Sequence, residues 1–108
     1  MSGYGEFYWN EGKRYKGFYL NDKKEGFGVY YWHDKTRIYI GFWKNGKQEG
    51  LGKYITEKHS KWGKWEKGDR KLWYDNKNEA FTDNDIDINL HSKFFDMGLK
   101  EATEYIMN

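Results

Sequence analysis

The side chains that could take part in acid–base or metal chemistry are few and scattered. The three histidines, His33, His59 and His91, have neither the spacing of metal ligands nor that of a catalytic triad. His33 precedes Asp34 between two repeats, where both residue types commonly form turns. Cysteine is absent, which excludes disulfides and thiolate ligands, and there is no glycine-rich phosphate loop. We therefore expect no catalytic residue, metal site or cofactor, and no enzyme activity.

Aromatic and basic side chains offer a second kind of chemistry, recognition by stacking and by charge. Phe, Tyr and Trp make up 21% of the chain, and basic residues interleaved with aromatic ones are typical of nucleic-acid binding surfaces. Aromatic hairpins with glycine turns also occur in wall-binding repeats that recognise choline or carbohydrate. The pI of about 8.6 is low for the first alternative. The second is typically extracellular, and the N-terminus carries no recognisable export signal.

Charge and composition divide the chain near Asp75. Residues 1–74 carry 16 Lys and Arg against 9 Asp and Glu, whereas residues 75–108 carry 3 against 8. The first part also holds 12 of the 13 glycines and 19 of the 23 aromatic residues. No apolar run approaches the roughly 18 residues that a membrane span needs. We therefore expect an intracellular, sheet-rich domain whose thin core consists largely of aromatic rings.

A repeat of 24 residues organises the first part. The residues that recur at this offset are Tyr15, Gly17, Tyr19, Lys23, Glu25, Gly26, Gly28 and Tyr30, which return as Tyr39, Gly41, Trp43, Lys47, Glu49, Gly50, Gly52 and Tyr54. The second half of the unit also stands before the first full copy, where Trp9 matches Trp32. Its first half returns later with Gly63 and Trp65. The expected layout is a half repeat at 3–14, full repeats at 15–38 and 39–60, and a closing half at 61–74.

Each unit has the pattern of a β-hairpin. Aromatic or glycine residues alternate with other residues at 15–19 and 39–43, which is the period of a strand. Asn45-Gly46 is a strong signal for a type I′ turn, because both of its residues need positive φ. Asn21-Asp22 is a weaker signal at the corresponding place.

Paired glycines in the second strand of each unit indicate a close approach to the backbone. We expect both glycines of a pair to share one face, with the ring of Tyr19 or Trp43 from the adjacent strand lying over them. Stacked hairpins would join these rings into a continuous ladder. The glycines expected to build the repeats are Gly17, Gly26, Gly28, Gly41, Gly50, Gly52 and Gly63.

This set of residues resembles the MORN repeat family. The second unit carries the motif as Tyr39-Ile-Gly41-Phe-Trp43, then Asn45-Gly46-Lys47, then Glu49-Gly50-Leu51-Gly52-Lys53-Tyr54. The first unit departs from it at Tyr19 and Asp22, and the closing half has Lys61 in place of the leading tyrosine. The resemblance covers residues 3–74. It implies a mainly β fold, an elongated single-layer antiparallel array of hairpins.

The last third of the chain lies outside the repeats. Residues 75–91 are acidic and polar, and we expect a linker there. Residues 92–107 have a one-sided apolar stripe typical of an amphipathic helix, with Ser92 as a plausible N-cap and Gly98 as a weak point. The expected contact residues of this helix are Phe94, Phe95, Leu99, Tyr105 and Ile106. They would either cap the open end of the sheet or dock on another protein.

The resemblance favours a non-catalytic scaffold subunit that binds other proteins of a large assembly. It makes a ciliary or axonemal, radial-spoke-like complex the leading setting, with the cytoskeleton second and an organellar complex as a further alternative. The residues expected to present an aromatic face are Tyr15, Tyr19, Tyr39, Trp43, Tyr54 and Trp65. The alternative function is an adaptor for phosphoinositide or other anionic membranes. Its candidate lipid-facing residues are Lys16, Lys24, Lys44, Lys53 and Lys64, which would otherwise form a solvated face.

Overall fold

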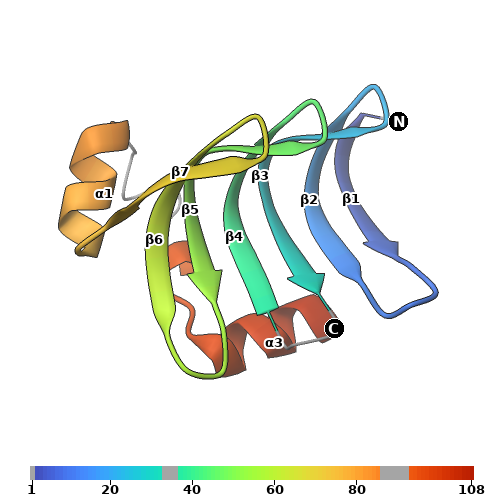
Figure 1. Ribbon diagram of the computed structural model, residues 1–108. Coiled ribbons are helices and arrows are strands. Elements are labelled where there is room, and N and C mark those ends of the chain that lie inside the picture. Colours follow the sequence, from blue (N-terminus) through green and yellow to red (C-terminus); the bar gives the residue numbers. More distant parts are fainter. Residues whose placement is uncertain (1, 33–36, 86–92) are drawn as a thin grey trace.

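The computed structural model describes residues 2–32, 37–85 and 93–108. Within these ranges the chain forms one open antiparallel sheet, in which each strand pairs with its neighbours in the sequence (Figure 1). The strands are β1 (Gly3–Tyr8), β2 (Arg14–Leu20), β3 (Lys23–Trp32), β4 (Arg37–Lys44), β5 (Lys47–Ile55), β6 (Ser60–Glu66) and β7 (Asp69–Tyr74). Helices α1 (Lys77–Asn84) and α3 (Leu99–Met107) follow. The expected mainly β fold, an antiparallel hairpin array with a C-terminal helix, is confirmed.

Three tight turns close the hairpins β2–β3, β4–β5 and β6–β7. The φ angles are +52° at Asn45 and +83° at Gly46, the left-handed pair that a type I′ turn requires. The same geometry recurs at Asn21-Asp22, with +52° and +65°, and at Lys67-Gly68, with +51° and +90°. Asparagine and aspartate tolerate this conformation better than most residues, so the weaker signal of the first turn still gives the same turn.

A row of glycines crosses the sheet. Its members pair across successive strands from β1 to β6 and are Gly5, Gly17, Gly28, Gly41, Gly52 and Gly63. Tyr15 and Tyr39 lie over this row. A Cβ atom on Gly28 would stand 2.1 Å from the Tyr15 hydroxyl oxygen, and one on Gly52 would stand 2.2 Å from the Tyr39 ring. Any side chain at these glycines would therefore displace the ring.

The expectation that Tyr19 or Trp43 covers the glycines is wrong. Each covering tyrosine folds along its own strand, because its hydroxyl donates a hydrogen bond to a carbonyl three residues later. Tyr15 donates to Phe18 O at 3.1 Å, and Tyr39 donates to Phe42 O at 3.0 Å. These bonds keep the two rings over the glycine row.

The two glycines of each pair have different roles. Just beyond the glycine row the hairpin register changes, between Gly17 and Tyr19 and between Gly41 and Trp43. Within these bulges, which lie on β3 and β5, Gly26 and Gly50 have φ of +81° and +82°, a conformation that costs glycine little. Gly26 and Gly50 thus permit the bend, whereas Gly28 and Gly52 admit the ring. Bulges increase twist and bend strands, and the hairpins curl toward their turns (Figure 1).

Both helices pack on one side of the sheet, called here the helix face. Helix α3 lies against β2, β3 and β4, and α1 lies against β5, β6 and β7 (Figure 1). The fully buried side chains of this layer include Val29, Ile38, Ile40, Leu51, Ile55, Ala80, Phe95, Ala102 and Ile106. The molecule measures 36 × 31 × 26 Å. The seven strands themselves form a single antiparallel layer, and the helices pack on one side of it.

The segment after the sheet is more structured than the sequence predicted. Helix α1 lies inside the expected linker at 75–91, and residues 86–91 of that linker lie outside the described residues. The Asn76 side chain caps α1 by accepting a hydrogen bond from the Glu79 N–H at 2.8 Å, and Phe81 is buried against the sheet. An asparagine followed three positions later by a glutamate, here Asn76 and Glu79, often marks the start of a helix. The sequence analysis overlooked this signal.

The C-terminal helix is interrupted rather than continuous over 92–107. Residues 93–95 are helical, and α3 begins only at Leu99. Gly98 stands at the N-cap with extended φ and ψ, and its N–H donates to the Glu101 carboxylate at 3.0 Å. Glycine is unfavourable inside a helix, so the chain breaks there and starts a new helix. The proposed N-cap, Ser92, lies outside the described residues.

Candidate interaction surface

The side of the sheet opposite the helices, called here the aromatic face, carries one cluster of rings. Tyr15, Tyr19, Tyr39, Trp43 and Trp65 form its buried part, and Phe7, Tyr30, Trp32 and Tyr54 pack against them. The six aromatic residues expected on one face are therefore together. The rings meet edge to face, with centroids 5.2 Å apart for Tyr39–Trp43 and 5.0 Å for Tyr39–Trp65. Neither α1 nor α3 covers this face.

Most of the predicted residues are buried by one another and do not themselves offer contact surface. Tyr15 and Tyr39 have no exposed area, and Trp65 is only 6% exposed. The accessible rings stand around them, above all Trp9 and Trp73, which are 36% and 37% exposed. Sequence reasoning did not single out either residue. For Trp9 a signal was present in the sequence, because the repeat aligns Trp9 with Trp32.

Lys24 occupies a cage of aromatic rings on this face. Its ammonium nitrogen lies 5.3–5.5 Å from four ring centroids, those of Trp9, Tyr15, Tyr30 and Trp43. Cation–π attraction favours this position, while burial lowers the pKa of the Lys24 ammonium by removing water from it. Lys24 is therefore held by the protein's own rings and does not form an outward-facing lipid contact.

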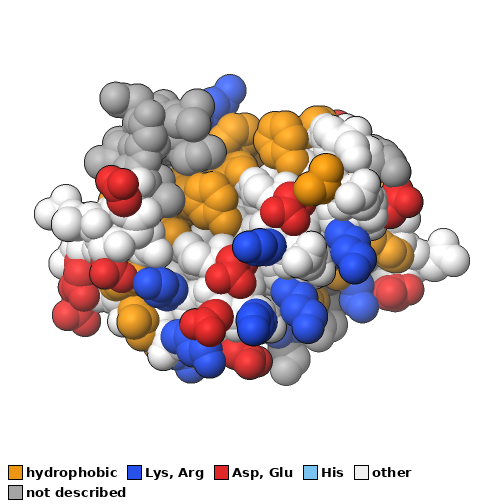
Figure 2. All heavy atoms as spheres, turned by 90° about the horizontal axis from the view of Figure 1, so that it is seen from above, with side chains coloured by type: hydrophobic (Ala, Val, Ile, Leu, Met, Phe, Trp, Pro, Cys, Tyr) orange, Lys and Arg blue, Asp and Glu red, His pale blue; other side chains and the backbone are white. Residues whose placement is uncertain are grey.

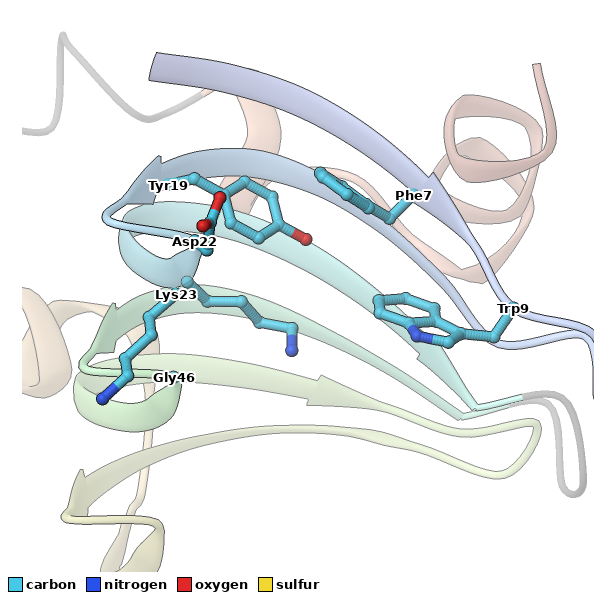
Figure 3. A pocket seen from close by; sticks show the side chains of 7 residues that line it. Phe7, Trp9, Tyr19, Asp22, Lys23 and Gly46 are labelled. Carbon is cyan, nitrogen blue, oxygen red and sulfur yellow. The ribbon is translucent and has the colours of Figure 1, made fainter. Parts of the chain in front are cut away.

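A pocket of about 350 Å³ adjoins the cage (Figure 3). Phe7, Trp9 and Tyr19 form its aromatic wall, and Asp22 and Lys23 stand at its side near the first hairpin turn. Lys24 also lines it. In the first repeat, the cation that lies among the rings is thus the ammonium of Lys24, a residue of the same chain.

The second repeat has glutamine where the first has Lys24. Gln48 pairs with Trp43 across its hairpin, as Lys24 pairs with Tyr19. Three of the rings that correspond to the first cage, Trp32, Tyr54 and Trp65, line another pocket of about 350 Å³, called here the Gln48 pocket. Its lining residues are Trp32, Arg37, Gln48, Tyr54, Trp65, Arg70 and Trp73. The guanidinium of Arg37 lies 5.2 Å from the Trp32 ring, and that of Arg70 lies 4.4 Å from the Trp73 ring.

Two of the candidate lipid-facing lysines lie on the helix face instead. Lys16 and Lys53 are 6% and 8% exposed. Lys16 donates a hydrogen bond to Tyr105 O at 2.7 Å, in the last turn of α3. Lys53 donates to Phe95 O and Met97 O, both at 2.8 Å, where the short helical segment ends. The expectation that these lysines face lipid is wrong, because they satisfy carbonyls left without partners at helix C-termini.

The remaining candidate lysines lie among acidic side chains. Lys44 is exposed at the hairpin-turn end of the sheet, and Lys64 lies 3.9 Å from the Asp83 carboxylate. The turn end also holds Lys47, Glu49 and other charged residues around a pocket of about 790 Å³. Seen from above, basic and acidic side chains are intermixed on this surface (Figure 2). The turn end is therefore not a uniformly basic patch.

The expected helix contacts are made within the chain. Phe95 and Ile106 are fully buried in the helix-face core, and Phe94, Leu99 and Tyr105 pack against that core. The Tyr105 hydroxyl also lies 3.0 Å from that of Tyr4 on β1. Covering a face of the chain's own sheet is thus what the helix does here. Its role as a docking surface for another protein is not supported at the buried positions.

Two glutamates that recur in the repeat have a structural role that sequence reasoning missed. Glu25 accepts a hydrogen bond from the Asn45 N–H at 3.1 Å, and Glu49 accepts one from the Lys67 N–H at 3.0 Å. Each glutamate thus ties its hairpin to the turn of the next. The signal was the recurrence of glutamate 24 residues apart, just before the glycine pair.

A comparison with models of protein families shows which family has this repeat. The model of the MORN repeat matches three consecutive segments, residues 1–14, 15–37 and 39–61, which together exceed half of the chain. The chain belongs to the MORN repeat family. MORN repeats form modules for protein interaction or membrane binding, and MORN repeat proteins are generally non-catalytic. A comparison with curated proteins gave no match. In the parts of the chain that the structure describes, no helix is long and apolar enough to cross a membrane.

Proposed function

We propose that this MORN repeat protein is a non-catalytic scaffold subunit that binds another protein through its aromatic face. The observation that supports this most is the contrast between the two faces of the sheet. The helix face is covered by α1 and α3, whereas neither helix covers the aromatic face. Trp9 and Trp73 remain more than a third exposed there, and exposed tryptophans are enriched at protein interfaces.

The C-terminal helices take a supporting role in this proposal. They shield the apolar helix face of a thin sheet, so the aromatic face is the one that the described helices leave for a partner. The setting we propose is a large assembly, first a ciliary or axonemal one and second the cytoskeleton, on the strength of family resemblance.

Native co-purification tests the scaffold function. The protein would be isolated from its source cells at about 50 and about 500 mM salt, concentrations that span weak and strong screening, and its partners identified by mass spectrometry. We expect stoichiometric partners to remain bound at high salt. A free chain under both conditions would contradict the proposal.

Exposed charge at the hairpin-turn end favours a second candidate, binding to an anionic membrane. The pocket there is lined by Lys23, Lys44, Lys47 and Lys67 together with Glu49 and Glu66. Lysines near an anionic surface each contribute about 1 kcal/mol. Sedimentation with phosphoinositide vesicles should then fall when Lys44 and Lys47 are both changed to glutamate. Unchanged sedimentation of this double variant, or none of the parent protein, would exclude the turn end as a membrane site.

A further inference from the structure

The ammonium of Lys24 differs from those of the two buried lysines in what surrounds it. Lys16 and Lys53 donate hydrogen bonds to backbone carbonyls, which replace the water that burial removes. Within residues 2–32, 37–85 and 93–108, no group accepts a hydrogen bond from the Lys24 ammonium and no carboxylate pairs with it. Four aromatic rings surround it instead. A bare ammonium, which carries three N–H donors, is therefore poorly satisfied in this cage.

The spacing of the rings fits a methylated ammonium. A methyl carbon in van der Waals contact with a ring lies about 3.5–4.0 Å from it, and a C–N bond is about 1.5 Å long. The nitrogen of a methylammonium that touches a ring is therefore about 5.0–5.5 Å away. The Lys24 nitrogen lies 5.3–5.5 Å from all four ring centroids. A methyl group on this nitrogen would fill the gap to a ring, which is how aromatic cages hold such cations.

We propose that Lys24 is a site of N-methylation, and that the rings of Trp9, Tyr15, Tyr30 and Trp43 hold its methylated ammonium. Methylation keeps the positive charge, so the cation–π attraction remains. It also replaces N–H donors that lack acceptors by methyl groups, which need none. This inference is independent of the proposed scaffold function.

The reaction needs a methyltransferase and a sulfonium methyl donor of the S-adenosylmethionine class. The neutral Lys24 amine attacks the methyl carbon, so the C–N bond forms as the C–S bond breaks. Sulfur keeps the electron pair and becomes a thioether, and one amine proton passes to water. Lys24 is half-buried and lines the pocket of Figure 3, and a lysine side chain is flexible. The amine can therefore leave the cage to react and return to it afterwards.

Mass spectrometry of the protein isolated from its source cells tests the proposal. Chymotrypsin cleaves after Leu20 and Phe27, and the peptide between these sites contains both Lys23 and Lys24. Lys23 is exposed at the same turn and serves as the internal control. We expect fragment masses that place one or more methyl groups on Lys24 and none on Lys23. Unmodified Lys24, an acetyl group in place of methyl groups, or equal methylation of both lysines would overturn the proposal.

Because the chain contains no cysteine, a second test can place the methylated group in the full chain. Lys24→Cys introduces a single thiol, which bromoethylamine and bromoethyl-trimethylammonium convert into thioether analogues of lysine and of trimethyllysine. We expect the trimethyl analogue to have an unfolding equilibrium constant about fivefold smaller than that of the lysine analogue. Urea denaturation measures both. Lys44→Cys, at an exposed position, is treated in the same way as control, and its two analogues should differ by less than about twofold.

The two tests fail in different ways. A trimethyl analogue at position 24 that is no more stable than the lysine analogue would refute the cage as a site for a methylated ammonium. A stabilised trimethyl analogue together with unmodified Lys24 in the native protein would mean that the cage accepts the group without carrying it, and would also overturn the proposal. If neither analogue folds, the mass spectra decide alone. Co-purification judges the scaffold function separately from each of these results.

Discussion

At the scale of single residues, glycine and tyrosine act as a pair. Tyr39 is fully buried although it stands on one face of an open sheet. It can be buried because Gly41 and Gly52 expose bare backbone beneath its ring, and its hydroxyl finds an acceptor in Phe42 O. The Tyr39 ring is therefore buried against the backbone of its own sheet, without a helix or a second sheet of the described chain above it.

Gly52→Ala should destabilise the protein by about 3 kcal/mol. The added methyl group would stand 2.2 Å from the Tyr39 ring, so the ring must leave the glycine row. Urea denaturation measures the change, and Lys58→Ala in an exposed loop serves as control, with an expected effect within about 0.5 kcal/mol. An unchanged denaturation midpoint for Gly52→Ala would contradict the ring-over-glycine arrangement.

Alkaline pH should weaken the fold through the same tyrosines. Burial raises the pKa of Tyr19 to about 12 and that of Tyr15 and Tyr39 well above the ordinary value. The unfolded chain loses these protons near pH 10, whereas the folded chain keeps them. Their contribution to stability is therefore fully present below pH 10 and is lost as pH rises through about 12.

Tyrosinate absorbance measures this effect directly. In the native protein the absorbance should rise at a higher pH than in the denatured chain, and the urea midpoint should fall from pH 10 upward. Coincident titration curves for the native and denatured protein would show that the rings are not protected.

At the scale of elements, cations from the sheet complete the ends of the helical segments. Neither α1 nor α3 has a basic residue in its last turn. Lys16 supplies the missing charge to the end of α3, and Lys53 does so for the segment that ends near Met97. The two lysines belong to one line of paired residues across the sheet, which passes through Val29 and Ile40.

Lys53→Met should cost about 2 kcal/mol of stability. Methionine keeps much of the apolar stem but leaves the carbonyls of Phe95 and Met97 without their donor. Hydrogen exchange should accelerate first in residues 93–107. Lys44→Met, at the exposed turn end, is the matched control. Equal protection in both variants would mean that the Lys53 bonds do not hold the helical segment.

Sequence patterns predicted these elements unevenly. The 24-residue repeat gave the strands and turns, because a β-hairpin is specified by local alternation and by residues such as Asn45-Gly46. It did not show which face of the sheet the helices cover. Alternation along the strands places Lys16 and Lys53 opposite the tyrosines, but only the packing of the C-terminal segment showed that this face is the buried one. The cage around Lys24 was also hidden, since its rings come from four different strands or loops.

At the scale of the whole molecule, sheet and helices form one folding unit. Phe95 joins them, with ring centroids 5.3–5.5 Å from those of Phe27, Trp62 and Phe81. These partners come from β3, β6 and α1. A single side chain of the C-terminal segment thus bridges most of the helix face.

Phe95→Asp should destabilise the isolated protein by more than about 3 kcal/mol, because it removes a buried ring and places a carboxylate in an apolar core. Thermal melting measures the loss, with Lys93→Asp at an exposed position as control. Retention of the parent melting temperature would mean that the helical segment does not pack on the sheet. The variant would then test outward docking on a partner instead.

The glycine row ends at the last strand, β7, where Trp73 pairs with Gly63 of β6. Every earlier step of the row sets bare backbone beside bare backbone. On β7 this position of the row carries the Trp73 indole, whereas every other strand has glycine there. The row therefore ends in an indole on β7 at one edge of the sheet and in Gly5 on β1 at the other.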